Sequence, residues 1–468
     1  MGEKKIKSLI NRKEKGIYEL PSTSIPGMKK PCRFILSEEL LDEIDEETIK
    51  QLANVAMLPG LASATIGLPD MHLGYGVPIG SVIGFQKEGG IISSGMVGFD
   101  INCGISLFKT GLDKESIASN KERLGKILLK RIPAGVGSKS KLKLSEDELF
   151  SIMKEGARWC VKKGYLQSSE LSNIEDNGCL EGADPTKVSK EAIKRGKNQL
   201  GSLGSGNHFV ELSYVRKVFD KNKADEYGLK EGNICVMIHT GSRGLGHQIA
   251  SDYVKLHLKA MDKYNLSFPD KQLVGVPIGS QEAMDYLKAM KCAANFSYAN
   301  KMVLASIIQD TLKEFFLGYR KESTLRGIYT ISHNICKKET FNGKEIYVHR
   351  KGATRAFPNE PAIIAGSMGT SSFLMKGTEK ALQYTLGSTC HGSGRALSRK
   401  AAKENLNLKN IEAALTKQGI SVFSPSKKGI IDEAPSAYKS VYSVIKAVVD
   451  AGISERIAEF SPLLVIKG

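Results

Sequence analysis

Short apolar segments bordered by a histidine are the feature of this sequence that most restricts its fold. Four of the eight histidines lie beside glycine, serine or asparagine at the end of such a segment. One histidine in this position is most often structural, but four alike indicate side chains gathered at several strand ends. The pattern therefore favours one site assembled from distant parts of the chain. The four are His208 in "GSGNHFVE", His239 in "MIHTGSRG", His333 in "TISHNIC" and His391 in "STCHGSGR".

Strands and helices mix along the chain without strict alternation, which predicts an α+β fold. We interpret residues 1–468 as a single large mixed domain, with helices flanking a doubly wound sheet and a basic segment at 1–50. No internal repeat or low-complexity linker divides it. Strands are expected at 208–215, 234–241, 327–335, 344–350 and 362–369, and helices at 113–131, 145–163, 186–199, 246–263, 280–317 and 436–450.

The formal net charge of the chain is +17, and the excess lysine is spread along its length. Polyanions are natural partners for such a surface, although a solvated lysine-rich surface explains the charge equally well. No apolar run approaches the roughly 18 residues of a membrane helix, and the first residues lack the apolar core of a signal peptide. We therefore expect a cytoplasmic protein that does not bind membranes.

An acid and a thiol, Asp100 and Cys103, lie three residues apart in the apolar stretch "VGFDINCGISLF". Carboxylate, thiolate and neutral imidazole bind divalent transition metals, and one thiolate can bridge two ions. We therefore expect Cys103 to be shared by two metals, with Asp100 and the histidines completing each shell. The alternative is a buried core thiol beside an aspartate that forms a turn.

Two features suggest phosphate as the group on which the metals act. The loop "LGSLGSGNH" (200–208) is able to bring backbone N–H groups against a phosphate. Guanidinium and ammonium groups beside the motifs suit phosphate oxygens, although each is equally explained as a surface charge. These residues are Arg243, Arg350, Lys351, Arg355, Arg395 and Arg399.

His391 differs from the other three histidines because it follows Cys390 and precedes a turn that leads into a helical segment. An imidazole at a helix start, facing metal-bound phosphate, is able to act as a nucleophile or as a further metal ligand. The chain contains no G-x-x-x-x-G-K-[ST] motif and no Asp-Gly pair. These absences exclude a P-loop enzyme and the Lys-x-Asp-Gly motif of nucleotidyl-lysine ligases.

Ten segments in this order resemble the RtcB family of RNA-splicing ligases, over nearly the whole chain beyond residue 50. The resemblance implies an enzyme that uses GTP and two manganese ions to join an RNA 3′-phosphate, or a 2′,3′-cyclic phosphate, to a 5′-hydroxyl in tRNA splicing or RNA repair. The segments are "GLPDMHLGYGVPIG", "GFDINCG", "GSGNHFVE", "HTGSRG", "SHN", "HRKGATRAFP", "GSMGTSS", "CHGSGR", "EAPSAYK" and the terminal "KG".

The resemblance also implies a role for individual residues. Asp100, Cys103 and His208 would bind one metal, and Cys103, His239 and His333 the other. His391, with Asp70 beside it, would attack GTP to give a histidine–GMP intermediate, from which GMP passes to RNA as RNA-ppG. The implied GMP contacts are Asn207, Glu211, Asn334, Gly366, Ser367, Ser372, Gly392, Ser393, Gly394, Tyr438 and Lys467, with Glu211 and Lys467 near the base; RNA phosphates would meet Arg243, Arg395 and Arg399.

Two other functions compete with RNA ligation. A dinuclear phosphodiesterase acting on RNA would explain the metal ligands and the charge but gives His391 and Lys467 no separate role. A non-catalytic RNA-binding protein is disfavoured by so many histidines in interior segments. Ligand type alone favours zinc or iron over manganese, because thiolates are soft. The sequence leaves open which RNA is used, whether an archease-type activator takes part, and the oligomeric state.

Overall fold

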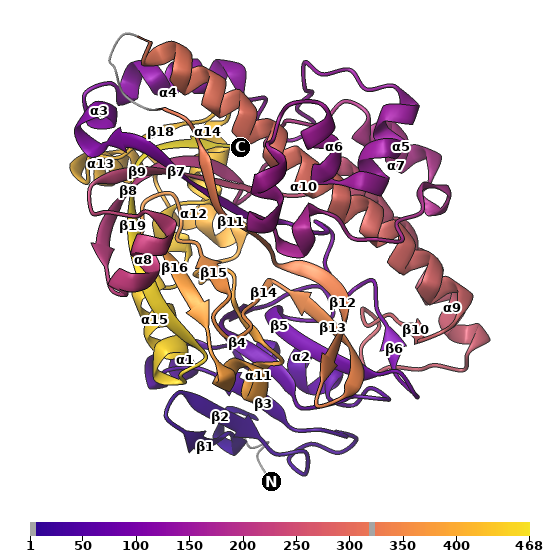
Figure 1. Cartoon of the computed structure of the whole chain (residues 1–468). Helices are drawn as coiled ribbons and strands as arrows, with labels where there is room; N and C mark the ends of the chain where they lie inside the picture. The colour runs from indigo at the N-terminus through magenta and orange to yellow at the C-terminus, as the bar shows by residue number, and fades with distance from the viewer. Residues whose placement is uncertain (1–5, 318–322) are drawn as a thin grey trace.

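Two large β-sheets organise the computed structural model, which describes residues 6–317 and 323–468 (Figure 1). The strand order of the first sheet is β1-β2-β3-β4-β5-β13-β12. Its strands are β1 (Asn11–Glu14), β2 (Ile17–Leu20), β3 (Cys32–Ile35), β4 (Thr65–His72), β5 (Ile79–Gln86), β13 (Lys344–Lys351) and β12 (Asn334–Phe341).

The second sheet has the strand order β11-β7-β9-β8-β19-β16-β15, and β18 pairs with β19. In the described parts of the chain, only β3–β4 and β18–β19 pair in parallel. The expected doubly wound sheet is therefore wrong, because that arrangement needs parallel strands joined by crossover helices. The strands are β7 (Gly104–Asp113), β8 (Phe209–Val218), β9 (Asn233–Thr240), β11 (Arg326–Ser332), β15 (Pro361–Ile364), β16 (Ser372–Gly377), β18 (Ser421–Phe423) and β19 (Ser454–Lys467).

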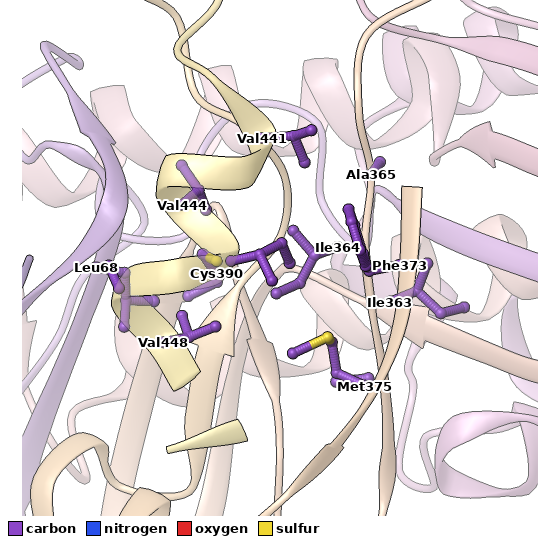
Figure 2. Close-up of a cluster of buried hydrophobic side chains, with 14 of the residues drawn as sticks. Leu68, Ile363, Ile364, Ala365, Phe373, Met375, Cys390, Val441, Val444 and Val448 are labelled. Carbon is purple, nitrogen blue, oxygen red and sulfur yellow. The ribbon is translucent and has the colours of Figure 1, made fainter. Parts of the chain in front are cut away.

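The central strands of the second sheet are buried on both faces, which explains why they are continuously apolar. In β9, Cys235 and Met237 pack into a core shared with the first sheet, whereas Ile234, Val236 and Ile238 pack into a second core on the opposite face. Figure 2 shows part of the shared core, where Leu68, Ile364 and Val444 lie around Cys390. By the two-residue period, His239 continues the face that points toward the first sheet.

The second core lies between the second sheet and a group of helices dominated by α10 (Gln281–Phe315). α9 (Arg243–Lys263) packs beside α10 (Figure 1). In the described residues, no helix is both long and apolar enough to cross a membrane. The other α-helices are α1 (Glu38–Glu43), α2 (Glu46–Val55), α3 (Lys114–Ala118), α4 (Lys121–Arg131), α5 (Glu146–Glu155), α6 (Ala157–Lys162), α7 (Lys190–Gly196), α8 (Lys221–Tyr227), α11 (Glu379–Thr385), α12 (Arg399–Asn405), α13 (Leu408–Lys417), α14 (Lys427–Asp432) and α15 (Val441–Asp450).

The α+β class is correct, and the expected elements differ from the observed ones mainly at breaks. The helix expected at 145–163 divides into α5 and α6 at Gly156, whose φ of +59° is not helical. The helix expected at 113–131 divides into α3 and α4. The strand expected at 327–335 turns at His333 into two strands, and that expected at 362–369 ends at Ile364.

Residues 6–50 are part of the first sheet and of the shared core, through β1, β2, β3, α1 and α2. The description of residues 1–50 as basic is wrong, because ten lysine and arginine residues are balanced by ten aspartate and glutamate residues. Residues 1–5 lie outside the described part of the chain. Because the first sheet joins strands from the beginning of the chain to strands beyond residue 333, its topology supports the proposal of one domain over 1–468.

Candidate functional site

Four adjacent strands of the second sheet bring the predicted metal ligands to one edge. In the order β11-β7-β9-β8, His333 follows the end of β11, Cys103 precedes β7, His239 lies near the end of β9 and His208 precedes β8. Because these strands are antiparallel, the start of one lies beside the end of the next. Residues far apart in the chain therefore become neighbours.

The side chains form two groups that share one sulfur atom. The Sγ atom of Cys103 lies 3.2 Å from Nε2 of His208 and 3.4 Å from Nε2 of His239. Nε2 of His239 is 3.4 Å from Nε2 of His333, and Oδ2 of Asp100 is 2.9 Å from Nε2 of His208. In each group, Asp100–Cys103–His208 and Cys103–His239–His333, the ligand atoms lie within 4.8 Å of one another. This geometry is suited to two cations bridged by Cys103.

The electrostatics of the cluster favour neutral imidazoles. Burial, with smaller contributions from neighbouring histidines, holds the pKa values of His239 and His333 well below their usual range. Burial and the Asp100 carboxylate raise the pKa of the Cys103 thiol. Burial acts to raise the pKa of Asp100 as well, but the hydrogen bond with His208 lowers it overall. Neutral histidines and a carboxylate are ready to bind a cation, whereas Cys103 must release a proton.

The donor set fits two divalent transition metals. It offers one carboxylate, three imidazoles and one thiol able to bridge. In the described residues, Nδ1 of each of His208, His239 and His333 is buried without a hydrogen-bond partner. Because Nε2 of each of these imidazoles faces the cluster, Nε2 is the nitrogen that would bind a cation.

His391 lies directly beside the cluster, with its ring centroid 4.6 Å from that of His333. Its Nδ1 is 2.7 Å from the carbonyl oxygen of Gly352 and 2.6 Å from Oδ2 of Asp70. A proton on Nδ1 donates to these oxygens, which leaves the lone pair of Nε2 free to react. His391 follows β17 (Ser388–Cys390), and α12 begins only at Arg399. The expected helix start at His391 is therefore wrong, and Asp70 and Gly352 orient the ring instead.

Asp70 is held in place by the backbone around it. Its side chain is fully buried, and Oδ2 also accepts a hydrogen bond from the backbone N–H of His391 at 3.2 Å. Nζ of Lys439 donates to the carbonyl groups of Pro69 and Met71, at 3.2 and 2.7 Å. These bonds fix the carboxylate against the imidazole.

The backbone of Gly394 packs closely against the backbone of Asp70. We therefore expect Gly394→Ala to destabilise the protein by about 3 kcal/mol or more. Its φ is +71°, and an added Cβ would lie 2.1 Å from the carbonyl oxygen of Asp70. Gly419 is a matched control, because its φ is +74° but nothing lies within 4 Å of an added Cβ. Gly419→Ala should cost only about 1 kcal/mol. Urea unfolding would measure both, and equal losses would contradict the role of the Asp70 contact.

Three predicted nucleotide contacts meet at the same edge of the second sheet. Lys467 lies at the end of β19 opposite Phe209, and its Nζ donates to Oδ1 of Asn207 at 3.2 Å. Glu211 is buried in β8, and Ser213 donates a hydrogen bond to it. Burial raises the pKa of Glu211 to about 7 and lowers that of Lys467 to about 8, while the attraction between their charges opposes both shifts.

The loops predicted to contact GMP surround His391. The backbone N–H of Gly366 donates to Oγ of Ser372 at 3.1 Å. Gly392 forms an isolated bridge with Ala365, and Oγ of Ser393 is 3.5 Å from the carbonyl oxygen of Ala365. Of the remaining predicted contacts, the backbone N–H of Ser367 donates to Thr370 and the hydroxyl of Tyr438 to Glu433.

Asn334 connects the predicted metal ligands to the predicted nucleophile, His391. Its Nδ2 donates to the backbone carbonyl of Asp100 at 3.0 Å, and its Oδ1 accepts from the backbone N–H of Gly352 at 2.8 Å. Gly352 in turn accepts from His391. Both polar atoms of the Asn334 side chain are therefore hydrogen-bonded within the protein, so that in this structure Asn334 positions the backbone at Asp100 and Gly352.

The predicted phosphate-binding arginines have different surroundings. Arg243 is largely buried and donates to Ser202, Gly135 and Ser138. Arg395 and Arg399 both contact Glu433, and the side chain of Arg399 is 59% exposed. Three other candidates serve the fold: Arg350 is paired with Glu339, Lys351 donates to the carbonyls of Tyr75 and Val77, and Arg355 is paired with Glu360.

Sequence reasoning missed a set of residues that hold the ligand loop. Asn102, at φ +56°, is fully buried, and its carbonyl accepts from Oγ of Ser297 at 2.6 Å and Nζ of Lys301 at 3.1 Å. Its Nδ2 donates to the carbonyl of Ala294 at 2.9 Å. These contacts fasten the segment between Asp100 and Cys103 to α10. Its signal was an asparagine between two ligands, a residue type that tolerates left-handed backbone.

The fold and the site together define an α+β protein built around a thiol shared by two candidate metal sites, with an oriented imidazole beside them. The model of the family described as "tRNA-splicing ligase RtcB" matches residues 51–468. The chain belongs to this family.

Archaeal proteins named tRNA-splicing ligase RtcB match almost the whole chain. The Methanococcus maripaludis protein is 42% identical over 99% of this chain and 100% of its own length. The Thermococcus kodakarensis protein is 42% identical over 98% of this chain and 99% of its own length. The Archaeoglobus fulgidus protein is 43% identical over 96% of this chain and 97% of its own length. The match therefore includes both large sheets.

Proposed function

We propose that this protein is a GTP-dependent RNA ligase that joins RNA 3′-phosphate or 2′,3′-cyclic phosphate ends to 5′-hydroxyl ends. The observation that carries the proposal is the position of His391, whose ring lies 4.6 Å from that of the predicted metal ligand His333. A phosphodiesterase would need the metals, but it would give the separately oriented imidazole of His391 no role. Family membership supports RNA as the substrate.

In this proposal, Nε2 of His391 attacks the α-phosphate of GTP, and a P–N bond forms as pyrophosphate leaves. Asp70 and the Gly352 carbonyl hold the Nδ1 proton and stabilise the positive charge that develops on the ring. A 2′,3′-cyclic phosphate is first hydrolysed by water to a 3′-phosphate with a free 2′-hydroxyl. GMP then passes to the RNA 3′-phosphate, giving RNA-ppG and freeing the imidazole. Attack by the 5′-hydroxyl releases GMP and joins the two strands.

Asp100, Cys103, His208, His239 and His333 would hold the two metal ions. When bound, these cations would neutralise charge on the transferring phosphoryl group. The thiolate and imidazoles suit zinc better than manganese, so Mn²⁺ rests on the family resemblance. A cytoplasmic location and an archease-type activator remain proposals.

Glu211 and Lys467 would recognise the guanine. We therefore expect Glu211→Gln to slow formation of the histidine–GMP adduct roughly tenfold or more, because a carboxylate accepts hydrogen bonds from two N–H groups of the base and an amide oxygen accepts from one.

The Glu211→Gln variant should also be more stable than the wild type at pH 8. The folded pKa of about 7 exceeds the ordinary 4.5. Stability from protonated Glu211 is therefore complete below pH 4.5 and is lost as the pH rises through 7.

Chemical unfolding at pH 5 and pH 8 would measure this effect, which we expect to favour the variant at pH 8 by on the order of 2 kcal/mol. Glu455→Gln is the control, since Glu455 is an exposed carboxyl on β19 paired with Lys376. It should change neither stability nor adduct formation. A difference for Glu211→Gln that does not grow with pH would contradict a buried carboxyl with a raised pKa.

Incubation of the protein with matched RNA ends, GTP and Mn²⁺ tests the proposal as a whole. We expect a joined product from a 3′-phosphate and a 5′-hydroxyl, and none when GTP is omitted. Cleavage of the RNA without joining, whether or not GTP is present, would favour the phosphodiesterase.

A further inference from the structure

Three aromatic side chains form a row at the surface beside the metal cluster. The ring centroid of Phe99 lies 6.0 Å from that of Tyr75, with the two rings edge to face at 70°, and 5.4 Å from that of His247. Tyr75 is 38% exposed, His247 is exposed, and Phe99 is half-buried between them. Large aromatic rings are usually buried, and the reaction described above gives these three no role.

One end of the row is anchored next to the nucleophile. The carbonyl oxygen of Tyr75 accepts a hydrogen bond from Nζ of Lys351 at 2.9 Å. The next residue, Gly352, accepts from Nδ1 of His391. The backbone of Tyr75 is thus tied to the loop that orients the imidazole, while its ring remains partly open to solvent.

The other end of the row lies beside the metal loop. Phe99 immediately precedes the predicted ligand Asp100, and its ring is inclined by only 31° to that of His247. Burial and the positive charge of Arg195 lower the pKa of His247, whereas the Asp100 carboxylate opposes this shift. His247 is therefore within electrostatic reach of both a metal ligand and an exposed arginine.

Exposed lysines lie on a loop that contacts the start of α9. Arg243 lies one turn before His247 in α9, and its Nη2 donates to Oγ of Ser138 at 3.1 Å. This bond ties the loop of residues 135–144 to the start of the helix. In the described part of the chain, the exposed lysines of this loop make no ion pair within 4.0 Å; they are Lys139, Lys141 and Lys143.

We infer that Tyr75, Phe99 and His247 form a platform on which the unpaired bases of an RNA end stack while its terminal phosphate lies at the metal cluster. The inference rests on the proposed function, which brings RNA to that cluster. Aromatic faces accept any base, and the exposed lysines of the loop of residues 135–144 suit the phosphate backbone. In a duplex end the bases already stack on each other, so the platform selects unpaired ends without selecting their sequence.

The test uses the full-length protein with Mn²⁺ but no GTP, so that binding is measured without reaction. The probe is a short single-stranded RNA with a 3′-phosphate and a distant fluorophore, compared with the same RNA made abasic at its terminal nucleotides. By fluorescence anisotropy, Phe99→Ala and Tyr75→Ala should each weaken binding of the complete RNA about tenfold. Binding of the abasic RNA should change less than about twofold.

Conservative and distant variants separate stacking from damage to the fold. Phe99→Tyr and Tyr75→Phe should bind the complete RNA within about twofold of wild type. Met284→Ala removes a similarly exposed apolar side chain, 42% exposed, at the start of α10, and should bind like wild type. Thermal unfolding of each variant identifies any that is misfolded. If Phe99→Ala is misfolded, Tyr75→Ala provides the test, because the Tyr75 side chain is more exposed.

The platform is overturned if the alanine variants bind the complete RNA like wild type, or lose the abasic RNA by the same factor. It is also overturned if Phe99→Tyr loses as much as Phe99→Ala. Transfer of labelled GMP from GTP to wild-type protein needs no RNA, so it reports the proposed function separately. If the wild-type protein is not labelled, the proposed function is wrong. If the wild type is labelled but the alanine variants bind RNA as the wild type does, only the platform is wrong.

Discussion

His391→Ala should abolish labelling of the protein by α-labelled GTP, with a loss of at least about a thousandfold. The imidazole of His391, which contacts both Asp70 and the ring of His333, would form the bond to GMP. The measurement is incubation with Mn²⁺ and labelled GTP followed by denaturing electrophoresis. Retained label on His391→Ala would remove His391 as the nucleophile.

A control for this variant separates the first step from the last. RNA already activated as RNA-ppG no longer needs the imidazole as a carrier. His391→Ala should therefore still join such RNA to a 5′-hydroxyl end, because the predicted metal ligands are untouched. If the variant failed with both GTP and RNA-ppG while retaining its metals, His391 would serve the later step as well.

Cys103→Ser should release both metal ions at once and eliminate ligation. The two groups of candidate ligands share only Cys103, and a neutral hydroxyl is a far weaker bridge than a thiolate. Metal content after equilibrium dialysis against Mn²⁺ measures the effect, and we expect affinity to fall at least about a hundredfold for both ions.

Two further variants test the sharing itself. His333→Ala should weaken the binding of one ion. The group of Asp100, Cys103 and His208, which would bind the other ion, should stay intact. Cys235→Ser alters a buried thiol in the adjacent strand β9 and should retain both ions. Loss of a single ion from Cys103→Ser would contradict a shared sulfur.

Much of the site could be predicted because the ends of strands have a recognisable sequence pattern. His239 follows the apolar run "ICVMI", whose alternation between two cores determines the face on which the imidazole lies. Asp100 and Cys103 precede β7 in the same way. What joins these residues is strand order, and the antiparallel order β11-β7-β9-β8 depends on the β11–β7 and β7–β9 pairings, which join segments more than a hundred residues apart. No local pattern contains that pairing.

The positioning residues were harder to predict for a different reason. Asn102, Gly352 and Lys439 act through hydrogen bonds that backbone carbonyls accept, and such bonds have no side-chain signature; only the left-handed backbone of Asn102 and Gly352 is hinted at by residue type. The same limit explains the wrong expectation at His391. A polar turn before a helical segment resembles a helix start, but seven residues separate His391 from the start of α12.

The position of β19 has a consequence for the cooperativity of folding. This strand pairs with β8 along most of its length, and its Lys467 reaches Asn207 beside the predicted ligand His208. The strands β7, β8, β9 and β11 position every candidate metal donor, but one flank of β8 stays unpaired until β19 joins the sheet. The candidate metal site and the contact between Lys467 and Asn207 should therefore become ordered in the same folding step.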